Sequence, residues 1–261
     1  MRRYFNRLAL FLAFLMCAAA PRPLAAAEAV LTAQELAAKL GAAIQDGDSV
    51  ARVRLTRSPA SSGEPAVLQV QIKSRRNPGG SSAVAYQILW PTERKGEAFV
   101  VSDKRPGAAF VPPDKRTRID SARMADPVFG TDLACQDTVE NFFLWEKQSL
   151  AGTETVRNSE CAILESKPGA GDSTPYGKVR SWIDLQRMAP ARVEKFDRSG
   201  RLVRRIETTQ WTKDDIGRSV PASMTVQRTG SGATTEIEGS SLRHDIKLSD
   251  RDFDPASLGA P

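Results

Sequence analysis

The only histidine of the chain, His244, is the first residue to consider for catalysis, because a Ser-His-Asp hydrolase would need it as the base. Such an enzyme also needs an activated nucleophile. The sequence contains neither a Gly-x-Ser-x-Gly turn nor a Ser-x-x-Lys arrangement that would supply one. We therefore predict no catalytic residue, and we interpret His244 as a half-exposed strand residue beside Asp245.

Paired carboxylates are the next groups that could do acid–base or metal chemistry. Asp214-Asp215 and the pair Asp250 and Asp252 lie among polar turn residues with basic neighbours, so we interpret them as solvated turns. A zinc site needs three or four Cys, His or carboxylate ligands, and histidines and cysteines are too few for an ordinary one. Segment 169–171 lacks the lysine and the helix that follow in a phosphate-binding loop. We expect no metal and no cofactor.

Residues 1–27 have the three parts of a secretory signal: early arginines, an apolar run from Leu8 to Ala20, and small residues before position 28. The apolar run of about 13 residues is shorter than the roughly 20 that span a bilayer, which disfavours a retained anchor. Cys17 follows Met16 rather than a small residue, so we do not expect acylation. We predict cleavage after Ala27 and export, with residues 28–261 forming a single domain.

Removal of this leader changes the charge of the protein. Four of the 37 basic residues and none of the 31 acidic ones lie within residues 1–27, which leaves 33 − 31 = +2. A nearly neutral exported chain offers little electrostatic attraction to nucleic acid, so nucleic acid is not expected as a partner.

Export also places Cys135 and Cys161 in a compartment that permits disulfides. A bridge between them would close a loop of about 25 residues and stabilise the fold by roughly 3 kcal/mol. We favour the bridge, and two buried thiols are the alternative.

The elements that would carry any site are mostly strands. Thr32 and Glu35 have capping-box spacing, and apolar residues recur at four-residue intervals after them, which predicts one helix from Ala33 to about Gln45. Alternating apolar and polar residues then predict strands at 51–56, 68–73, 83–90, 98–102, 153–157, 161–166, 206–213, 222–228 and 234–242. In the third of these, one face carries Val84, Tyr86, Ile88 and Trp90, and the other carries Ala83, Ala85 and Leu89.

The most regular pattern lies between Lys178 and Thr208, where two strands are joined by a turn at 197–200. We predict that one face carries Val179, Ser181, Ile183, Val193 and Lys195, with Trp182 and Glu194 on the other. This indicates a sheet built from meandering hairpins.

From Pro106 to Gln148 the strand pattern breaks down. Pro112-Pro113 argues against an interior strand at 110–113, and residues 129–133 show no sustained period. We expect part of this region to cover the sheet rather than to join it. Residues 137–145 fit either a short helix or a strand, and the sequence leaves that choice open.

Several segments, taken in order, resemble the LolA-like outer-membrane lipoprotein-sorting protein family of Gram-negative bacteria. The resemblance covers roughly residues 80 to 258. The matching segments are Phe110-Val111-Pro112 with 116–119, 129–133 with Asp137, 159–165, 179–184 with Pro190, 194–202, 220–224 and Phe253-Asp254-Pro255. Asn158-Ser159 replaces the glycine-bearing turn that the family usually has before the strand of Cys161.

The resemblance implies a mainly β (α+β) fold. A single curved antiparallel sheet forms a half-open β-barrel, with the N-terminal helix and short helices or loops over its mouth. The barrel encloses an apolar cavity for acyl chains, whose burial gains about 0.8 kcal/mol per CH₂ group. The candidate lipid-binding residues are Tyr86, Ile88, Trp90, Phe110, Val111 and Trp182. Lys115, Arg116 and Arg118, which follow the two prolines, are candidates for contact with a head group or a partner.

We therefore predict a monomeric periplasmic carrier, and no enzyme, that binds acyl chains of a lipid or lipoprotein and moves them towards the outer membrane. The resemblance implies an inner-membrane transporter and an outer-membrane acceptor as its partners. The alternative is a periplasmic sensor module that recognises lipids or lipoproteins without transporting them. An envelope hydrolase would require His244 to act with a nucleophile that the sequence does not reveal.

Overall fold

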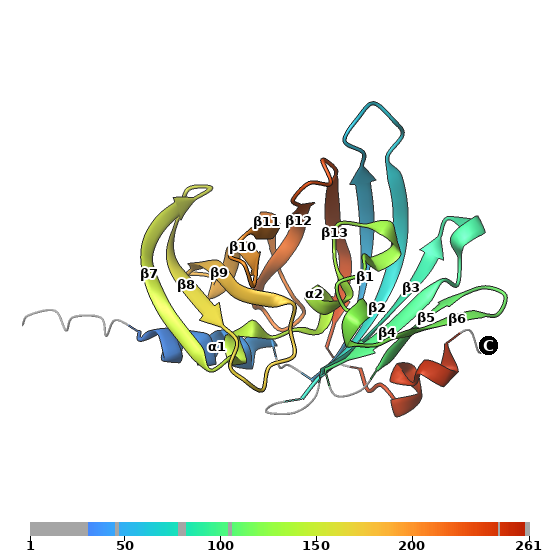
Figure 1. The fold of residues 1–261 in the computed structure, drawn as a ribbon, viewed down its shortest axis with the longest axis horizontal. Coiled ribbons are helices and arrows are strands. Elements are labelled where there is room, and N and C mark those ends of the chain that lie inside the picture. The colour runs from blue at the N-terminus through green and yellow to red at the C-terminus, as the bar shows by residue number, and fades with distance from the viewer. Residues whose placement is uncertain (1–30, 45–46, 78–81, 104–105, 245, 259–261) are drawn as a thin grey trace, which may run out of the picture. The chain divides into compact units, whose positions relative to one another are not determined.

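The computed structural model describes residues 31–258 except 45–46, 78–81, 104–105 and 245 (Figure 1). The predicted signal peptide and Asp245 lie outside the described residues. No described helix combines the length and the apolar character that crossing a membrane would require.

One antiparallel sheet of 13 strands makes up most of the fold (Figure 1). Its strands are β1 (Gly47–Ser58), β2 (Ala66–Arg76), β3 (Ser82–Trp90), β4 (Ala98–Ser102), β5 (Gly107–Val111), β6 (Lys115–Ile119), β7 (Lys147–Val156), β8 (Ser159–Lys167), β9 (Tyr176–Asp184), β10 (Ala189–Asp197), β11 (Leu202–Lys213), β12 (Ser219–Arg228) and β13 (Thr234–Arg243). They follow the order β6-β5-β4-β3-β2-β1-β13-β12-β11-β10-β9-β8-β7. Since β6 and β7 are the two edges and do not pair with each other, the sheet is curved but not closed, which confirms the predicted half-open fold class.

The described helices are few and short, apart from the first. They are α1 (Ala33–Ile44), α2 (Cys135–Val139) and the 3₁₀ turns η1 (Thr92–Arg94), η2 (Ser121–Arg123), η3 (Val128–Gly130), η4 (Phe142–Leu144), η5 (Asp250–Phe253) and η6 (Pro255–Ser257). The predicted capping box begins α1: the Glu35 carboxylate accepts from the Thr32 backbone N–H at 2.8 Å, and the Glu35 N–H donates to Thr32 Oγ1 at 3.2 Å. The predicted helix is thus confirmed, with its end at Ile44.

The hairpin of β10 and β11 closes as the sequence predicts. Asp197 Oδ1 accepts hydrogen bonds from the backbone N–H groups of Ser199 (2.9 Å) and Arg201 (3.0 Å), and Gly200 supplies the positive φ of 83°. The predicted faces are also confirmed. Val179, Ile183 and Lys195 are buried on the side that α1 covers, whereas Trp182 belongs to a cluster on the other side of β9.

Residues 121–145, which we call the covering segment, lie on the sheet rather than in it, as expected. The segment contains α2, so the helical alternative is correct for the start of 137–145, and the η4 turn follows. The expectation for 110–113 was wrong in part. Residues 107–111 form β5, which pairs with β4 and β6. Pro112 and Pro113 do not prevent this pairing, because they lie in the turn after the strand.

The core has two parts on the inner face, defined as the face that α1 and the covering segment contact. The first lies between the β1–β4 region and the covering segment, and includes Val70, Ile88, Phe99, Leu133 and Val139. The second lies between α1, η4 and β8–β10, and includes Leu36, Leu40, Phe143, Leu164 and Ile183. On the outer face, the C-terminal turns pack on β3–β5 through Phe253 and Leu258.

Candidate functional site

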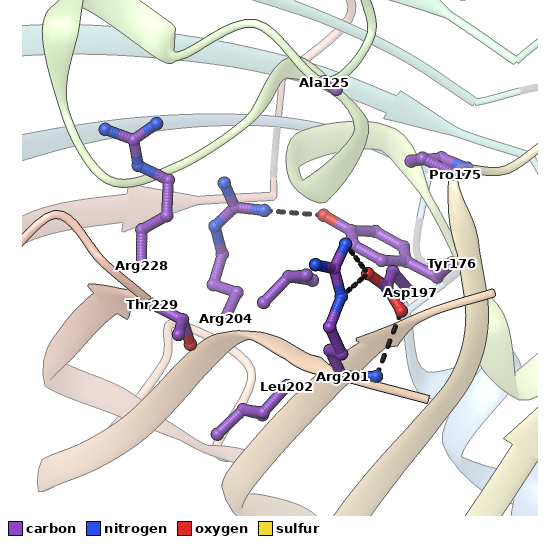
Figure 2. A pocket seen from close by; sticks show the side chains of 10 residues that line it. Ala125, Pro175, Tyr176, Asp197, Arg201, Leu202, Arg204, Arg228 and Thr229 are labelled. Atoms are coloured by element: carbon purple, nitrogen blue, oxygen red, sulfur yellow. Dashed lines mark hydrogen bonds and ion pairs between the residues drawn. The ribbon is translucent and has the colours of Figure 1, made fainter. Parts of the chain in front are cut away.

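A pocket of about 420 Å³ opens between the covering segment and the turn end of the β10–β11 hairpin (Figure 2). We call it the hairpin pocket. It is lined by Ala125, Pro175, Tyr176, Asp197, Arg201, Leu202, Val203, Arg204, Arg228 and Thr229. Its walls are therefore mainly aliphatic and aromatic surface, with arginines at intervals along them.

Four separate parts of the chain position these walls. Leu202 and Val203 begin β11, Tyr176 begins β9, and Ala125 comes from the covering segment. The Thr229 N–H donates to the Val203 carbonyl at 3.1 Å, which holds the end of β12 against β11 beside the pocket. The β11 wall packs on the core, since Val203 contacts the cluster that contains Tyr176 and Ile183.

A buried ion-pair network forms the inner end of the pocket, and Asp137 of α2 is its centre. Asp137 Oδ1 accepts from Lys195 Nζ at 2.8 Å and from the Tyr176 hydroxyl at 2.7 Å. Its Oδ2 accepts from the Ala134 N–H at 2.8 Å and lies 3.1 Å from Arg204 Nη1. Two cations, a phenol and a backbone N–H thus converge on one carboxylate.

The same surroundings fix the ionisation of the network. Burial alone would raise the pKa of Asp137, but the charges of Lys195 and Arg204 together with the hydrogen bonds hold that pKa below its usual value. Burial, followed by the adjacent Asp137 carboxylate, raises the pKa of Tyr176 far above its usual value. Burial also raises the pKa of Glu140, although Lys195 Nζ lies 3.5 Å from its Oε2. The network therefore holds an ionised Asp137 beside a neutral phenol.

Arg204 extends the network along the covering segment. Its Nε donates to the Asp132 carbonyl at 2.6 Å, and its Nη1 donates to the Tyr176 hydroxyl at 2.7 Å. The Asp132 carboxylate in turn accepts from Thr235 Oγ1 of β13 at 2.8 Å. Side chains of β10, β11 and β13 thereby hold the covering segment over the inner face.

A second cavity of about 990 Å³, which we call the polar groove because charged and amide side chains lie among its apolar ones, is lined in part by Gln136 and Glu140 next to this network. Residues from the end of β6, from the covering segment and from 171–175 line it. Pro175 lines both cavities, whereas Tyr176 and Arg204 face the hairpin pocket and Gln136 and Glu140 face the groove. Residues of the network, or next to it, therefore line both cavities.

The predicted lipid-binding residues fall in several places. Tyr86 and Ile88 lie together on the inner face, where the Tyr86 ring stacks on Phe99 with centroids 4.7 Å apart and burial raises the pKa of Tyr86 to about 12. Trp90, 47% exposed, stands at the end of β3. Tyr86 and Ile88 thus share a face with Val84, as predicted, but they are core residues that pack beneath α2.

The other three candidates lie elsewhere in the sheet. Phe110 packs on the outer face with Phe253, and Val111 is exposed beside it. Trp182 lies in a separate outer cluster, where its indole N–H donates to Glu154 Oε2 at 2.7 Å. The structure thus does not gather the six candidates into one cavity, and none of them lines the hairpin pocket as the described residues define it.

The three predicted basic contacts have different surroundings. Arg116 donates to the carbonyls of Pro255 (2.7 Å) and Leu258 (2.6 Å), and its guanidinium lies over the Phe110 ring at 5.4 Å. It therefore holds the C-terminal turns in place. Lys115 is exposed, and Arg118 lines the polar groove.

The favoured disulfide is not present in the structure. Cys135 and Cys161 are free buried thiols. Cys135 begins α2 and packs into the inner core with Tyr86, whereas Cys161 packs with Trp182 on the outer face of β8. The sheet separates the two cysteines, which agrees with the alternative of two buried thiols and corrects the expected bridge.

His244 follows the last residue of β13, Arg243, so it lies just beyond a strand rather than in one, and it is partly buried. Its Nδ1 and its backbone N–H both bond Asp215, while Arg218 Nη2 lies 2.9 Å from its Nε2. Ligand atoms of Asp214, Asp215 and His244 lie within 4.8 Å of one another, as a metal site would require. However, Arg218 Nε already lies 2.8 Å from Asp214 Oδ2, so a cation there would meet a guanidinium.

The residues around the hairpin pocket were missed by sequence reasoning. One signal was available, because strand alternation places Lys195 on the face of Val193 and places Arg204 on the face of Ile206. A charged side chain on an otherwise buried face requires a buried partner. That argument leads to the network but not to its partners in the covering segment.

Comparison with known proteins gives the family and the fold. A family model described as "Uncharacterized protein" matches residues 82–260, and no curated protein matches the chain. A DUF1329 family protein from Desulfovibrio piger is 22% identical with a TM-score of 0.78, over 87% of this chain and 97% of that one. A putative outer membrane lipoprotein-sorting protein domain from Vibrio parahaemolyticus is 21% identical with a TM-score of 0.75, over 87% and 98%.

A third similar structure is a LolA superfamily protein from Nitrosomonas europaea, 20% identical with a TM-score of 0.70, over 88% of this chain and 100% of that one. At such identities the likeness shows the shared fold. The chain therefore belongs to the uncharacterised family whose model covers residues 82–260, and its fold is LolA-like.

Proposed function

We propose that the protein is a periplasmic carrier that binds an acyl chain of a lipid or lipoprotein in the hairpin pocket and moves it towards the outer membrane. The observation that carries this proposal is a pocket of about 420 Å³ with mainly apolar walls, set under the covering segment of a LolA-like fold. Its volume falls within the roughly 300–1,000 Å³ of ligand sites in general. The outer membrane lipoprotein-sorting domain among the similar structures suggests the class of cargo.

The pocket walls account for how such a cargo would be held. Leu202, Val203 and Ala125 offer aliphatic surface from two sides, and Tyr176 offers a ring at the inner end. Each buried CH₂ group would contribute about 0.8 kcal/mol, so affinity would grow with the length of chain that enters. No bond is made or broken in this role, and release requires only a competing apolar site.

Transport also needs a donor and an acceptor. We propose an inner-membrane transporter as the donor and an outer-membrane acceptor as the destination, with the carrier acting as a monomer between them. The predicted signal peptide at residues 1–27 would bring the chain to the periplasm.

The direct test is binding of a fluorescent fatty acid to the exported, processed protein, together with mass spectrometry of the lipid that co-purifies with it. The decisive variant is Ala125→Trp, which places an indole at the mouth of the pocket at an exposed position. Its matched control is Ala122→Trp, three residues earlier in the same segment, also exposed and outside the pocket lining.

We expect Ala125→Trp to weaken binding at least about tenfold, equivalent to about 1.4 kcal/mol, while Ala122→Trp binds like the parent protein. Absence of co-purified lipid and of fatty-acid binding in the parent protein would contradict the proposal. Equal effects of the two tryptophans would place the acyl site elsewhere.

A further inference from the structure

Three arginines line the hairpin pocket, and two of them are already neutralised by acidic partners (Figure 2). Arg201 Nε lies 2.9 Å from Asp197 Oδ2, and Arg201 Nη2 lies at the same distance from that oxygen. Arg204 is paired with the buried Asp137 carboxylate at 3.1 Å. Asp197 is the sole acidic residue among those lining the pocket, and its charge is balanced by Arg201.

The third arginine, Arg228, ends β12 at an exposed position. Among the described residues, its guanidinium has no hydrogen bond or ion pair, and its backbone carbonyl accepts bonds from the Ser231 hydroxyl and the Ser231 N–H. Arg228 therefore brings a full positive charge to the pocket that the described residues do not balance.

The register of the sheet places this arginine beside one that is already paired. Arg228 lies directly opposite Arg204 in the β11–β12 pair, and the charge of Arg204 is balanced by Asp137. Figure 2 shows both side chains extending from the strands towards the covering segment. An anion bound between Arg228 and this segment would balance the charge of Arg228, because a guanidinium can bind carboxylate or phosphate oxygens through two parallel hydrogen bonds.

We propose that the hairpin pocket selects amphiphiles with an anionic head group, a carboxylate or a phosphate, which pairs with Arg228 while the acyl chain lies against Leu202, Val203 and Ala125. This inference rests on the proposed function and specifies the class of its cargo. An apolar wall next to an unbalanced guanidinium matches a molecule that carries both parts. A small anion would make no contact with the apolar wall, and a neutral lipid would not pair with the charge of Arg228.

The test compares two ligands that differ only in the head group, namely lysophosphatidic acid and a monoacylglycerol with the same acyl chain. Each displaces a fluorescent fatty acid from the exported, processed protein, from Arg228→Gln and from Arg54→Gln. Arg54 is an exposed arginine of β1 that lines none of the cavities described above, so its substitution removes the same charge at a distance. Thermal unfolding of each variant checks that the fold is retained.

We expect the parent protein and Arg54→Gln to prefer lysophosphatidic acid by about tenfold or more, and Arg228→Gln to lose that preference while it still binds the monoacylglycerol. Added salt should reduce the preference. Equal binding of the two lipids by the parent protein, or an unchanged preference in Arg228→Gln, would overturn the inference and leave the carrier role standing. Failure of both lipids to bind would instead refute the carrier role.

Inorganic phosphate distinguishes a lipid head group from a free anion. We expect millimolar phosphate to leave the bound probe in place, because phosphate gains nothing from the apolar wall. Displacement by phosphate as effective as displacement by lysophosphatidic acid would mean that the pocket binds small anions alone, and would overturn the inference.

Discussion

Asp137 and Lys195 form an ion pair of 2.8 Å whose two side chains are 0% and 2% exposed. The pair joins α2 of the covering segment to β10 of the sheet. Removal of one partner from such a pair leaves the other charge buried without compensation, which costs far more than the intact pair contributes. The attachment of the covering segment thus depends on charge balance at one point.

Asp137→Asn should therefore destabilise the protein by about 3 kcal/mol or more, because the buried cations Lys195 and Arg204 would lose the carboxylate that they share, and Glu140, 3.5 Å from Lys195, has a pKa raised by burial. Urea unfolding measures the loss. The control is Asp126→Asn, which breaks an exposed pair with Arg123 in the same segment and should cost less than about 1 kcal/mol. Equal losses of unfolding free energy in the two variants would show that the buried pair contributes no more to stability than the exposed one.

The pH dependence of stability should reflect Asp252, which Lys73 and Ser249 bind. Burial opposes its ionisation, but the hydrogen bonds from these partners outweigh it and lower the pKa of Asp252 to about 2. A lowered carboxyl pKa contributes stability above its unfolded value of 3.8, and that stability is lost as the pH falls towards 2. Asp252→Asn should therefore cost about 2 kcal/mol at pH 6 and little near pH 2.

The matched control for this effect is Asp250→Asn, two residues earlier in the same turn, where the carboxylate is 98% exposed. We expect its unfolding free energy to follow that of the parent protein across the pH range. If the difference in unfolding free energy between Asp252→Asn and the parent protein stayed constant from pH 6 to pH 2, the proposed contribution of the Asp252 pKa to stability would be wrong.

The two thiols should be unreactive in the folded protein. Burial raises the pKa of Cys135 to about 11, so little thiolate forms at neutral pH, and Cys161 is also buried. We expect iodoacetamide to modify neither cysteine of the native processed protein, and to modify both in urea without a reductant. If the mass showed that neither cysteine is modified under those denaturing conditions, the result would support a disulfide between Cys135 and Cys161.

Arg116 should act on the C-terminal turns rather than on a ligand. Arg116→Ala removes the bonds to the carbonyls of Pro255 and Leu258, so hydrogen exchange at residues 250–258 should become faster. Lys115→Ala, which changes an exposed neighbour, should leave that exchange unaltered. Weakened acyl binding without faster exchange would support the original expectation of a head-group contact.

Sequence patterns correctly predicted the elements that are fixed by contacts between neighbouring residues. The bonds between Thr32 and Glu35 begin α1, and the Asp197 turn joins β10 to β11, so both could be inferred from a few adjacent residues. Strand alternation also placed Val179 and Trp182 on opposite faces. It did not reveal β5, because Pro112-Pro113 argued against a strand there, whereas β5 ends at Val111, before the prolines.

Such patterns could not predict the hairpin pocket, because its residues come from distant parts of the chain. Tyr176, Arg204 and Asp137 meet only once the covering segment lies on the sheet. Alternation marks Lys195 as a buried cation, but its partner is 58 positions away. The aromatic residues chosen instead, such as Trp182 and Phe110, are apolar enough for a ligand but are used in outer-face packing.

The covering segment has a further property that follows from its bonding. In the described residues, its backbone–backbone hydrogen bonds stay within the segment or reach the adjacent Asp120, as with Val128 N–H to the Leu133 carbonyl and Cys135 N–H to the Asp126 carbonyl. Its ties to the sheet are made by side chains, as in the contacts of Arg204 and Thr235 with Asp132. Displacing the segment would break ion pairs and apolar contacts but no strand pairing. The register of the strands therefore does not depend on the covering segment, although the segment and the sheet share the inner core.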